Sequence, residues 1–175
     1  MDRISAAVRV NGELRTTPAD LPPDALFPIY SITKTLTAMC VLRLVEIGSV
    51  RLDDRVGQWL PEVNVPATIT LTHLLRHTSG LRDYGPLPDY HRAVRSHPGQ
   101  PWTRQQFLDA VLPQGLLWAP GERFSYSNVG YMLLVDIVER VTGQAFAPGW
   151  CAPRVVASTA EEITRPGSAA FILTP

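Results

Sequence analysis

Two long apolar segments with helical spacing constrain the fold of this chain more than any other feature. The first runs from Ser31 to Ile47 and is followed by Gly48, and the second runs from Asn128 to Gly143. In each segment apolar residues recur three and four positions apart, which predicts an α-helix that ends at a glycine. The apolar surface of the first segment is broad, so we expect most of that helix to be buried.

A β-hairpin is expected at the N-terminus. Asn11 and Gly12 separate two short segments with strand character, and this pair tolerates the positive φ that a tight hairpin turn requires. Shorter helices are expected over 70–80 and from Thr103, where Gln106 completes a capping box. The Pro- and Gly-rich segment 81–101 predicts a surface excursion.

Composition and charge exclude several classes of function. The chain has 175 residues, 45% of them hydrophobic, with 16 basic and 16 acidic side chains. Because these charges are interspersed, nucleic acid is not an expected partner. No apolar run approaches the ~20 residues of a membrane span, and the charged N-terminus does not resemble a signal peptide. As written, the sequence predicts a cytoplasmic location, whereas a gene model shortened at its N-terminus would allow a periplasmic or secreted one.

Lys34 stands three residues after Ser31, at the expected start of the first long helix. It is the only lysine, and the other fifteen basic residues are arginine. Positions i and i+3 of a helix lie about 5–6 Å apart on one face, so the hydroxyl and the amine can meet. A serine needs a base to become a nucleophile, and lysine, unlike arginine, can act as one in an apolar site near a helix N-terminus. The plain alternative is a capping serine beside a solvated lysine, and chance gives this spacing roughly one time in twenty.

A second motif precedes the second long helix. Tyr126 and Asn128 form a Y-x-N sequence, which arises by chance roughly one time in ten. A tyrosine hydroxyl aimed at a Ser–Lys pair could relay a proton to a leaving group, and an asparagine amide could bind the substrate or hold the lysine. The alternative is a packed aromatic followed by a helix N-cap. Ser127 needs no role in either interpretation.

Four segments of this chain resemble, in the same order, segments of the serine β-lactamase-related hydrolases. This family includes class C β-lactamases, D-alanyl-D-alanine carboxypeptidases and similar esterases. The four segments are FPIYSITKTLTA, LDDRVGQWLPE, ITLTHLLRHTSGL and PGERFSYSNVGYMLLVDIVERVTGQ. Together they cover roughly residues 25–146, so the resemblance is far more specific than either short motif.

The resemblance implies acyl transfer by named residues. Ser31 would be the acylated nucleophile, Lys34 its base, Tyr126 the proton relay, and Asn128 a substrate contact. The implied fold is α+β and β-lactamase/transpeptidase-like, with the N-terminal hairpin in an antiparallel sheet beside a mostly helical region. No cofactor is implied, and the partner is a small-molecule substrate: a β-lactam, a D-Ala-D-Ala peptide or an ester. The sequence does not distinguish these classes or determine the oligomeric state.

The chain departs from the family pattern near its C-terminus. Family members are longer and carry a K-T-G or H-x-G strand there, and neither sequence follows Asn128. That strand supplies one of two oxyanion donors, and loss of one donor typically costs ~10²–10³ in rate. We therefore expect a partial hydrolase domain over 1–146 that lacks the C-terminal strands of the sheet. The unpatterned tail over 147–175 would be the product of a frameshift or a truncation.

Two competing interpretations remain open. His73 and His77 have the i, i+4 spacing of zinc ligands, but Leu74 stands where H-E-x-x-H has its glutamate, so no metal site is predicted. Structural or solvent-exposed roles are expected for both histidines. The stronger rival is a non-catalytic remnant or pseudo-enzyme that acts as a binding module.

Overall fold

The chain divides into two compact units, and the boundary between them falls inside a helix. The computed structural model describes residues 6–11, 13–17, 27–146 and 171–172. One unit comprises Met1–Thr35 and Ala152–Pro175, and the other comprises Leu36–Cys151. Each unit is described by itself below.

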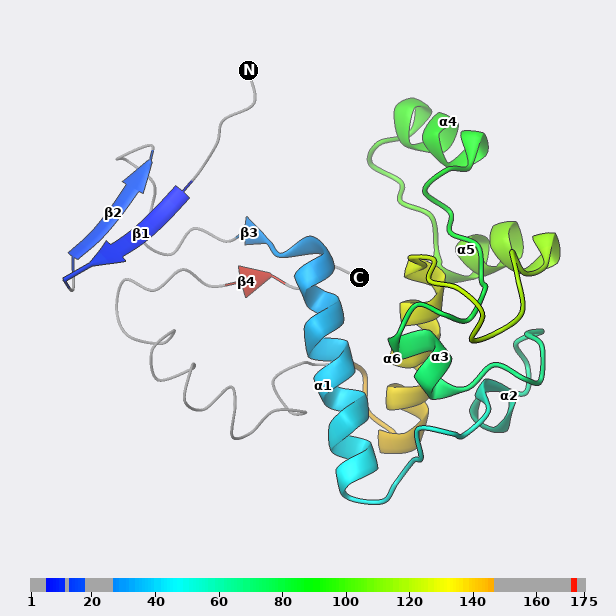
Figure 1. Ribbon diagram of the computed structural model, residues 1–175. Coiled ribbons are helices and arrows are strands. Elements are labelled where there is room, and N and C mark those ends of the chain that lie inside the picture. Colours follow the sequence, from blue (N-terminus) through cyan, green and yellow to red (C-terminus); the bar gives the residue numbers. More distant parts are fainter. Residues whose placement is uncertain (1–5, 12, 18–26, 147–170, 173–175) are drawn as a thin grey trace. The chain divides into compact units, whose positions relative to one another are not determined.

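The smaller unit contains the predicted hairpin. Strands β1 (Ala6–Val10) and β2 (Glu13–Thr17) pair antiparallel, with Val10 opposite Glu13. Asn11 lies in the turn with φ of 50°, which confirms the expected turn chemistry. Strand β3 (Phe27–Pro28) pairs parallel with β4 (Phe171–Ile172), an element that no sequence pattern predicted (Figure 1). The rest of the predicted tail, 147–170 and 173–175, lies outside the described residues.

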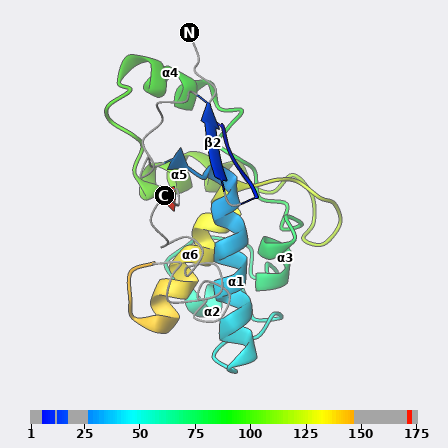
Figure 2. The ribbon, with the colours of Figure 1, turned by 90° about the vertical axis from the view of Figure 1, so that its left-hand side faces the viewer.

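Helices dominate the larger unit. The turn η1 (Tyr30–Ile32) belongs to the smaller unit, and α1 (Thr33–Glu46) begins there and continues into the larger one. The helical elements that follow are α2 (Val56–Trp59), α3 (Leu71–Leu75), α4 (Pro88–Ser96), α5 (Arg104–Val111), η2 (Leu112–Gln114) and α6 (Asn128–Thr142). Helix α6 packs against α2, α3 and α5 (Figure 1 and Figure 2). Its Leu133, Leu134 and Val138 side chains are 0% exposed and form the middle of the hydrophobic core. The second long helix is thus confirmed, and it ends at Gly143 with φ of 67°.

Helix α1 confirms the first long helix but not its expected burial. Cys40, Val41 and Leu44 are buried in the core, whereas the side chains of Leu42 and Ile47 are 50% and 56% exposed. Cys40 is disulfide-bonded. The prediction of a mostly buried helix was therefore wrong, because within the described structure α1 buries only one face.

Two boundaries in the middle of the chain differ from the predictions. Helix α3 begins after Thr70 as expected but ends at Leu75, because His77 has φ of 55° and breaks the helical path before Gly80. The expected surface excursion contains helix α4, which begins with Pro88 at its first position. Helix α5 follows its predicted capping box, in which Thr103 and Gln106 pair reciprocally.

The described residues contain no helix long and apolar enough to cross a membrane.

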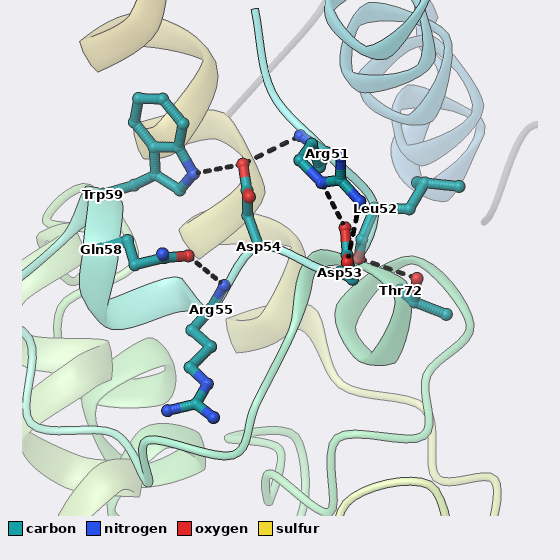
Figure 3. A network of polar contacts seen from close by, with 8 residues as sticks. All are labelled: Arg51, Leu52, Asp53, Asp54, Arg55, Gln58, Trp59 and Thr72. Atoms are coloured by element: carbon teal, nitrogen blue, oxygen red, sulfur yellow. Dashed lines mark hydrogen bonds and ion pairs between the residues drawn. The ribbon is translucent and has the colours of Figure 1, made fainter.

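Local polar contacts fold the segment between α1 and α3. Figure 3 shows that the Asp54 carboxylate accepts hydrogen bonds from the Arg51 backbone N–H at 2.8 Å and from Trp59 Nε1 at 3.2 Å. The Arg51 guanidinium binds Asp53 and lowers the pKa of that carboxyl group. Thr72 Oγ1 donates to the Leu52 carbonyl at 2.8 Å and so joins this turn to α3. The two aspartates thus hold the turn between α1 and α2.

Asp136 on α6 provides a pH-dependent contribution to stability. Its side chain is 14% exposed and pairs with Arg104, yet burial raises its pKa above the ordinary value of 3.8. A raised folded-state pKa means that the folded chain binds this proton more tightly than the unfolded chain. The free energy of unfolding therefore falls as pH rises from about 3.8 through the raised pKa.

We expect Asp136→Asn to remove this contribution to the pH dependence. In urea unfolding series run from acidic to neutral pH, the stability of the wild type should decline relative to the variant as pH rises. Asp89→Asn is the control, since the Asp89 side chain is 75% exposed. A difference between wild type and Asp136→Asn that stays constant with pH would contradict the prediction.

Candidate active site

Ser31 and Lys34 come together at the junction of η1 and α1. Ser31 lies within the 3₁₀ turn Tyr30–Ile32, and Lys34 is the second residue of α1. Residues three apart along a helical turn lie on the same face, which brings the two side chains together. Lys34 Nζ lies 3.5 Å from Ser31 Oγ, at the long end of hydrogen-bond distances. Ser31 is exposed and Lys34 is half-buried.

The residue before Ser31 has an unusual backbone conformation. Tyr30 has φ of 45°, in the left-handed region that non-glycine residues rarely adopt, and its side chain is 76% exposed. Such strained residues cluster at active sites, where they present a reacting group at a sharp turn. The S-x-x-K spacing does not predict this conformation, which directly precedes Ser31.

The Y-x-N residues lie where a loop enters helix α6. Asn128 is the first residue of α6, and Ser127 rather than Asn128 is the helix N-cap. Ser127 Oγ accepts a hydrogen bond from Gly130 N–H at 3.2 Å and donates one to the Arg82 carbonyl at 3.1 Å. Ser127 is 1% exposed. The residue between the two motif positions therefore has a structural role that the sequence interpretation did not give it.

His77 organises the loop that carries Tyr126. Its carbonyl accepts the Ser125 N–H at 2.8 Å, and its Nδ1 accepts the Ser127 N–H at 3.2 Å. The His77 ring stacks on Tyr126 with centroids 4.6 Å apart, and Tyr131 packs against it at 4.8 Å. Burial raises the pKa of Tyr131. The imidazole is thus part of the packing that sets the position of the Tyr126 ring.

His73, the other histidine of the pair, has a local contact of its own. Its Nδ1 accepts the Thr70 N–H at 3.2 Å, while the Thr70 hydroxyl accepts the His73 N–H at 3.4 Å. The two side chains form the capping box of α3. Both histidines therefore have the structural roles that were expected for them.

Asp83 holds Asn128 by two hydrogen bonds. The Asn128 backbone N–H donates to Asp83 Oδ1 at 2.8 Å, and the Asn128 Nδ2 amide donates to Asp83 Oδ2 at 2.9 Å. Asp83 lies in the segment that was expected to be a surface excursion. No local pattern marks it, because it stands 45 positions from its partner in the sequence.

An aromatic cluster next to Asp83 holds the excursion against α5. The Tyr84 ring lies 4.3 Å from Phe107 and 4.8 Å from Tyr90, and Trp102 packs against Phe107 at 5.4 Å. Burial raises the pKa of Tyr84 to about 12. Both neighbours of Asp83 are therefore held, since the Arg82 carbonyl binds Ser127 and the Tyr84 ring is packed.

The four predicted site residues fall in the two units of the chain. Ser31 and Lys34 belong to the smaller unit, and Tyr126 and Asn128 belong to the larger one. The turn before α1 brings Ser31 and Lys34 within 3.5 Å of each other. The loop that enters α6 carries Tyr126, and Asn128 is the first residue of that helix.

Comparison with known sequences identifies one family. A family profile described as beta-lactamase matches residues 3–148. Penicillin-binding protein 4* of Bacillus subtilis is 35% identical over 129 residues, which cover 73% of this chain and 28% of that protein. The D-alanyl-D-alanine-carboxypeptidase/endopeptidase AmpH of Escherichia coli is 31% identical over 148 residues, which cover 82% of this chain and 35% of AmpH.

Comparison with solved structures gives the same assignment at the level of fold. A D-stereospecific amidohydrolase from Streptomyces superposes with a TM-score of 0.69 and 30% identity, over 78% of this chain and 43% of that one. The chain spans about a third of the length of the two curated relatives, 28% and 35%. The described helical region therefore corresponds to part of a β-lactamase/transpeptidase-like fold.

Proposed function

The chain belongs to the beta-lactamase family, and from this premise we propose that it is a serine hydrolase whose reaction passes through an acyl-enzyme on Ser31. The relatives named above include a carboxypeptidase and an amidohydrolase, which supports hydrolysis at the level of the family. The observation that carries the proposal is the distance of 3.5 Å between Ser31 Oγ and Lys34 Nζ. The only lysine of the chain thus lies beside an exposed serine at a strained turn.

The proposed first step is acylation. Lys34 accepts the proton of the Ser31 hydroxyl while Oγ forms a bond to the carbonyl carbon of the substrate. The tetrahedral intermediate collapses, the bond to the leaving group breaks, and Tyr126 gives the leaving group its proton. The proton that Tyr126 gives up is balanced by the one that Lys34 gained, so both side chains return to their starting states before the second step. Asn128 contacts the substrate through its side-chain amide.

The second step is hydrolysis of the acyl-enzyme. A water molecule attacks the ester carbonyl and Lys34 accepts its proton. The bond between the acyl carbon and Ser31 Oγ then breaks, and Lys34 gives that proton to Oγ, which restores the hydroxyl. The substrate is a β-lactam, a D-Ala-D-Ala peptide or an ester, the three classes that the family resemblance implies.

Covalent labelling tests the proposal. A fluorescent penicillin and a fluorophosphonate probe should each label the wild-type chain, and Ser31→Ala should abolish labelling because it removes the attacked oxygen. Ser49→Ala is a matched control, since Ser49 is an exposed serine outside the motifs. Nitrocefin and p-nitrophenyl acetate would then separate β-lactam from ester hydrolysis.

The same experiment separates the enzyme from the non-catalytic alternative. If neither probe labels the folded wild type, and hydrolysis of both chromogenic substrates stays at background in wild type and Ser31→Ala alike, the chain is not a hydrolase. A binding module or pseudo-enzyme would then be the better description.

A further inference from the structure

Asn128 is held at two points by one carboxylate. Asp83 Oδ1 accepts the Asn128 backbone N–H at 2.8 Å, and Asp83 Oδ2 accepts a hydrogen bond from Asn128 Nδ2 at 2.9 Å. The two oxygens therefore act on different parts of the same residue. One caps the N-terminus of α6, where a negative charge is favourable, and the other contacts the side-chain amide.

The carboxylate determines which end of the amide faces it. An ionised carboxylate has acceptors only, so it can bind the NH₂ end of an asparagine but not the carbonyl end. Rotating the amide by half a turn would place Asn128 Oδ1 against Asp83 Oδ2 with no hydrogen between the two oxygens. The amide orientation thus follows from the chemistry of its partner.

Asp83 is itself held on both sides along the chain. The carbonyl of Arg82 accepts a hydrogen bond from Ser127 Oγ at 3.1 Å, and the ring of Tyr84 packs 4.3 Å from that of Phe107. The carboxylate therefore has a defined position relative to the start of α6. The Asp83 carboxylate can therefore determine the orientation of the Asn128 side chain.

We propose that Asp83 is a positioning residue, which fixes the orientation of the Asn128 amide with its Nδ2 toward Asp83 and its Oδ1 turned away from Asp83. This inference rests on the function proposed above for Asn128. Asp83 touches no reacting atom in this scheme. It acts only through Asn128, and its loss would allow the amide to invert, so that NH₂ and oxygen exchange places.

Asp83→Asn separates positioning from helix capping. An asparagine at position 83 keeps an oxygen for the Asn128 N–H, but its own NH₂ then faces the Asn128 side chain, so the Asn128 amide should invert. We expect the folded variant to be labelled by fluorescent penicillin about 10- to 100-fold more slowly, the scale of a misplaced binding group. Asp89→Asn, which removes an exposed aspartate elsewhere, should not change the rate.

A double variant tests the direction of the effect. In Asp83→Asn/Asn128→Asp, the asparagine NH₂ donates to the new carboxylate, whose second oxygen takes the place of Asn128 Oδ1. This variant should recover most of the labelling rate lost in Asp83→Asn, whereas Asn128→Asp alone, with two facing carboxylates, should not. If Asp83→Asn labels at the wild-type rate, or if the double variant is no better than Asp83→Asn, the positioning role is wrong.

Side-chain amide NMR gives a readout that does not depend on activity. The Nδ2 protons of Asn128, assigned by their loss in Asn128→Ala, should include one that exchanges with water more slowly than those of exposed Asn64, and Asp83→Asn should abolish this protection. If these protons exchange slowly in a wild-type chain that no probe labels, the Asp83–Asn128 contact is present and only the proposed hydrolase function fails. Exchange of both protons as fast as in Asn64 would overturn the inference.

Discussion

Lys34→Arg is expected to slow acylation of Ser31 by about 10²- to 10⁴-fold, the usual contribution of a general base. Arginine keeps the positive charge and much of the side-chain volume, but it stays protonated at any accessible pH and cannot accept the Ser31 proton. The half-buried position of Lys34, 3.5 Å from Ser31 Oγ, is the geometric basis of this expectation. The rate of labelling by fluorescent penicillin measures the effect directly.

The control for this variant is the reverse exchange at another position of the same helix. Arg43 pairs with Glu46 at 2.6 Å, and its side chain is 47% exposed, so Arg43→Lys should leave both labelling and fold unchanged. Circular dichroism would verify that Lys34→Arg is folded. A labelling rate in Lys34→Arg equal to that of the wild type would show that Lys34 is not the base.

Gly80→Ala is expected to lower the free energy of unfolding more than any other substitution proposed for this chain. Gly80 has φ of 76°, and a Cβ atom at this position would overlap the backbone carbonyl oxygen of Trp118. The Gly80 carbonyl also accepts the Leu117 N–H at 2.8 Å, so the two loops cannot separate without losing a hydrogen bond. We expect the free energy of unfolding to fall by about 3 kcal/mol or more, from backbone strain and steric overlap together.

Urea unfolding measures this loss, and a second glycine supplies the control. Gly57 lies in helix α2 with nothing within 4 Å of the position of a Cβ atom, so the same substitution meets no obstacle there. Gly57→Ala should be neutral or stabilise the chain by about 0.5–1 kcal/mol, because alanine favours a helix interior. Equal unfolding midpoints for the two variants would contradict the steric argument.

The elements that could be predicted from the sequence are those that local interactions define. The hairpin depends on Asn11 and its neighbours, α5 begins at its own capping box, and α6 has an apolar pattern that ends at Gly143. The end of α3 was predicted wrongly because contacts between distant segments of the chain set it. The end of α3 follows from the backbone turn at His77, whose carbonyl binds the loop before α6.

The candidate site divides in the same way. Ser31 and Lys34 could be paired from the sequence because one turn of helix separates them, and the structure places their side-chain atoms 3.5 Å apart. The Y-x-N motif could be recognised, but its supports could not. His77 is 50 positions from Ser127, and Asp83 is 45 positions from Asn128.

The sequence by itself indicated the family, the two long helices and the pairing of Lys34 with Ser31. The family follows from the resemblance of four segments, the helices from their apolar periodicity, and the pairing from spacing within one helical turn. Only the tertiary structure decided that Asp83 holds Asn128 and that Ser127 rather than Asn128 caps α6. Hydrogen bonds between segments far apart in the chain leave no periodic trace in either segment, so they become visible only when the chain is folded.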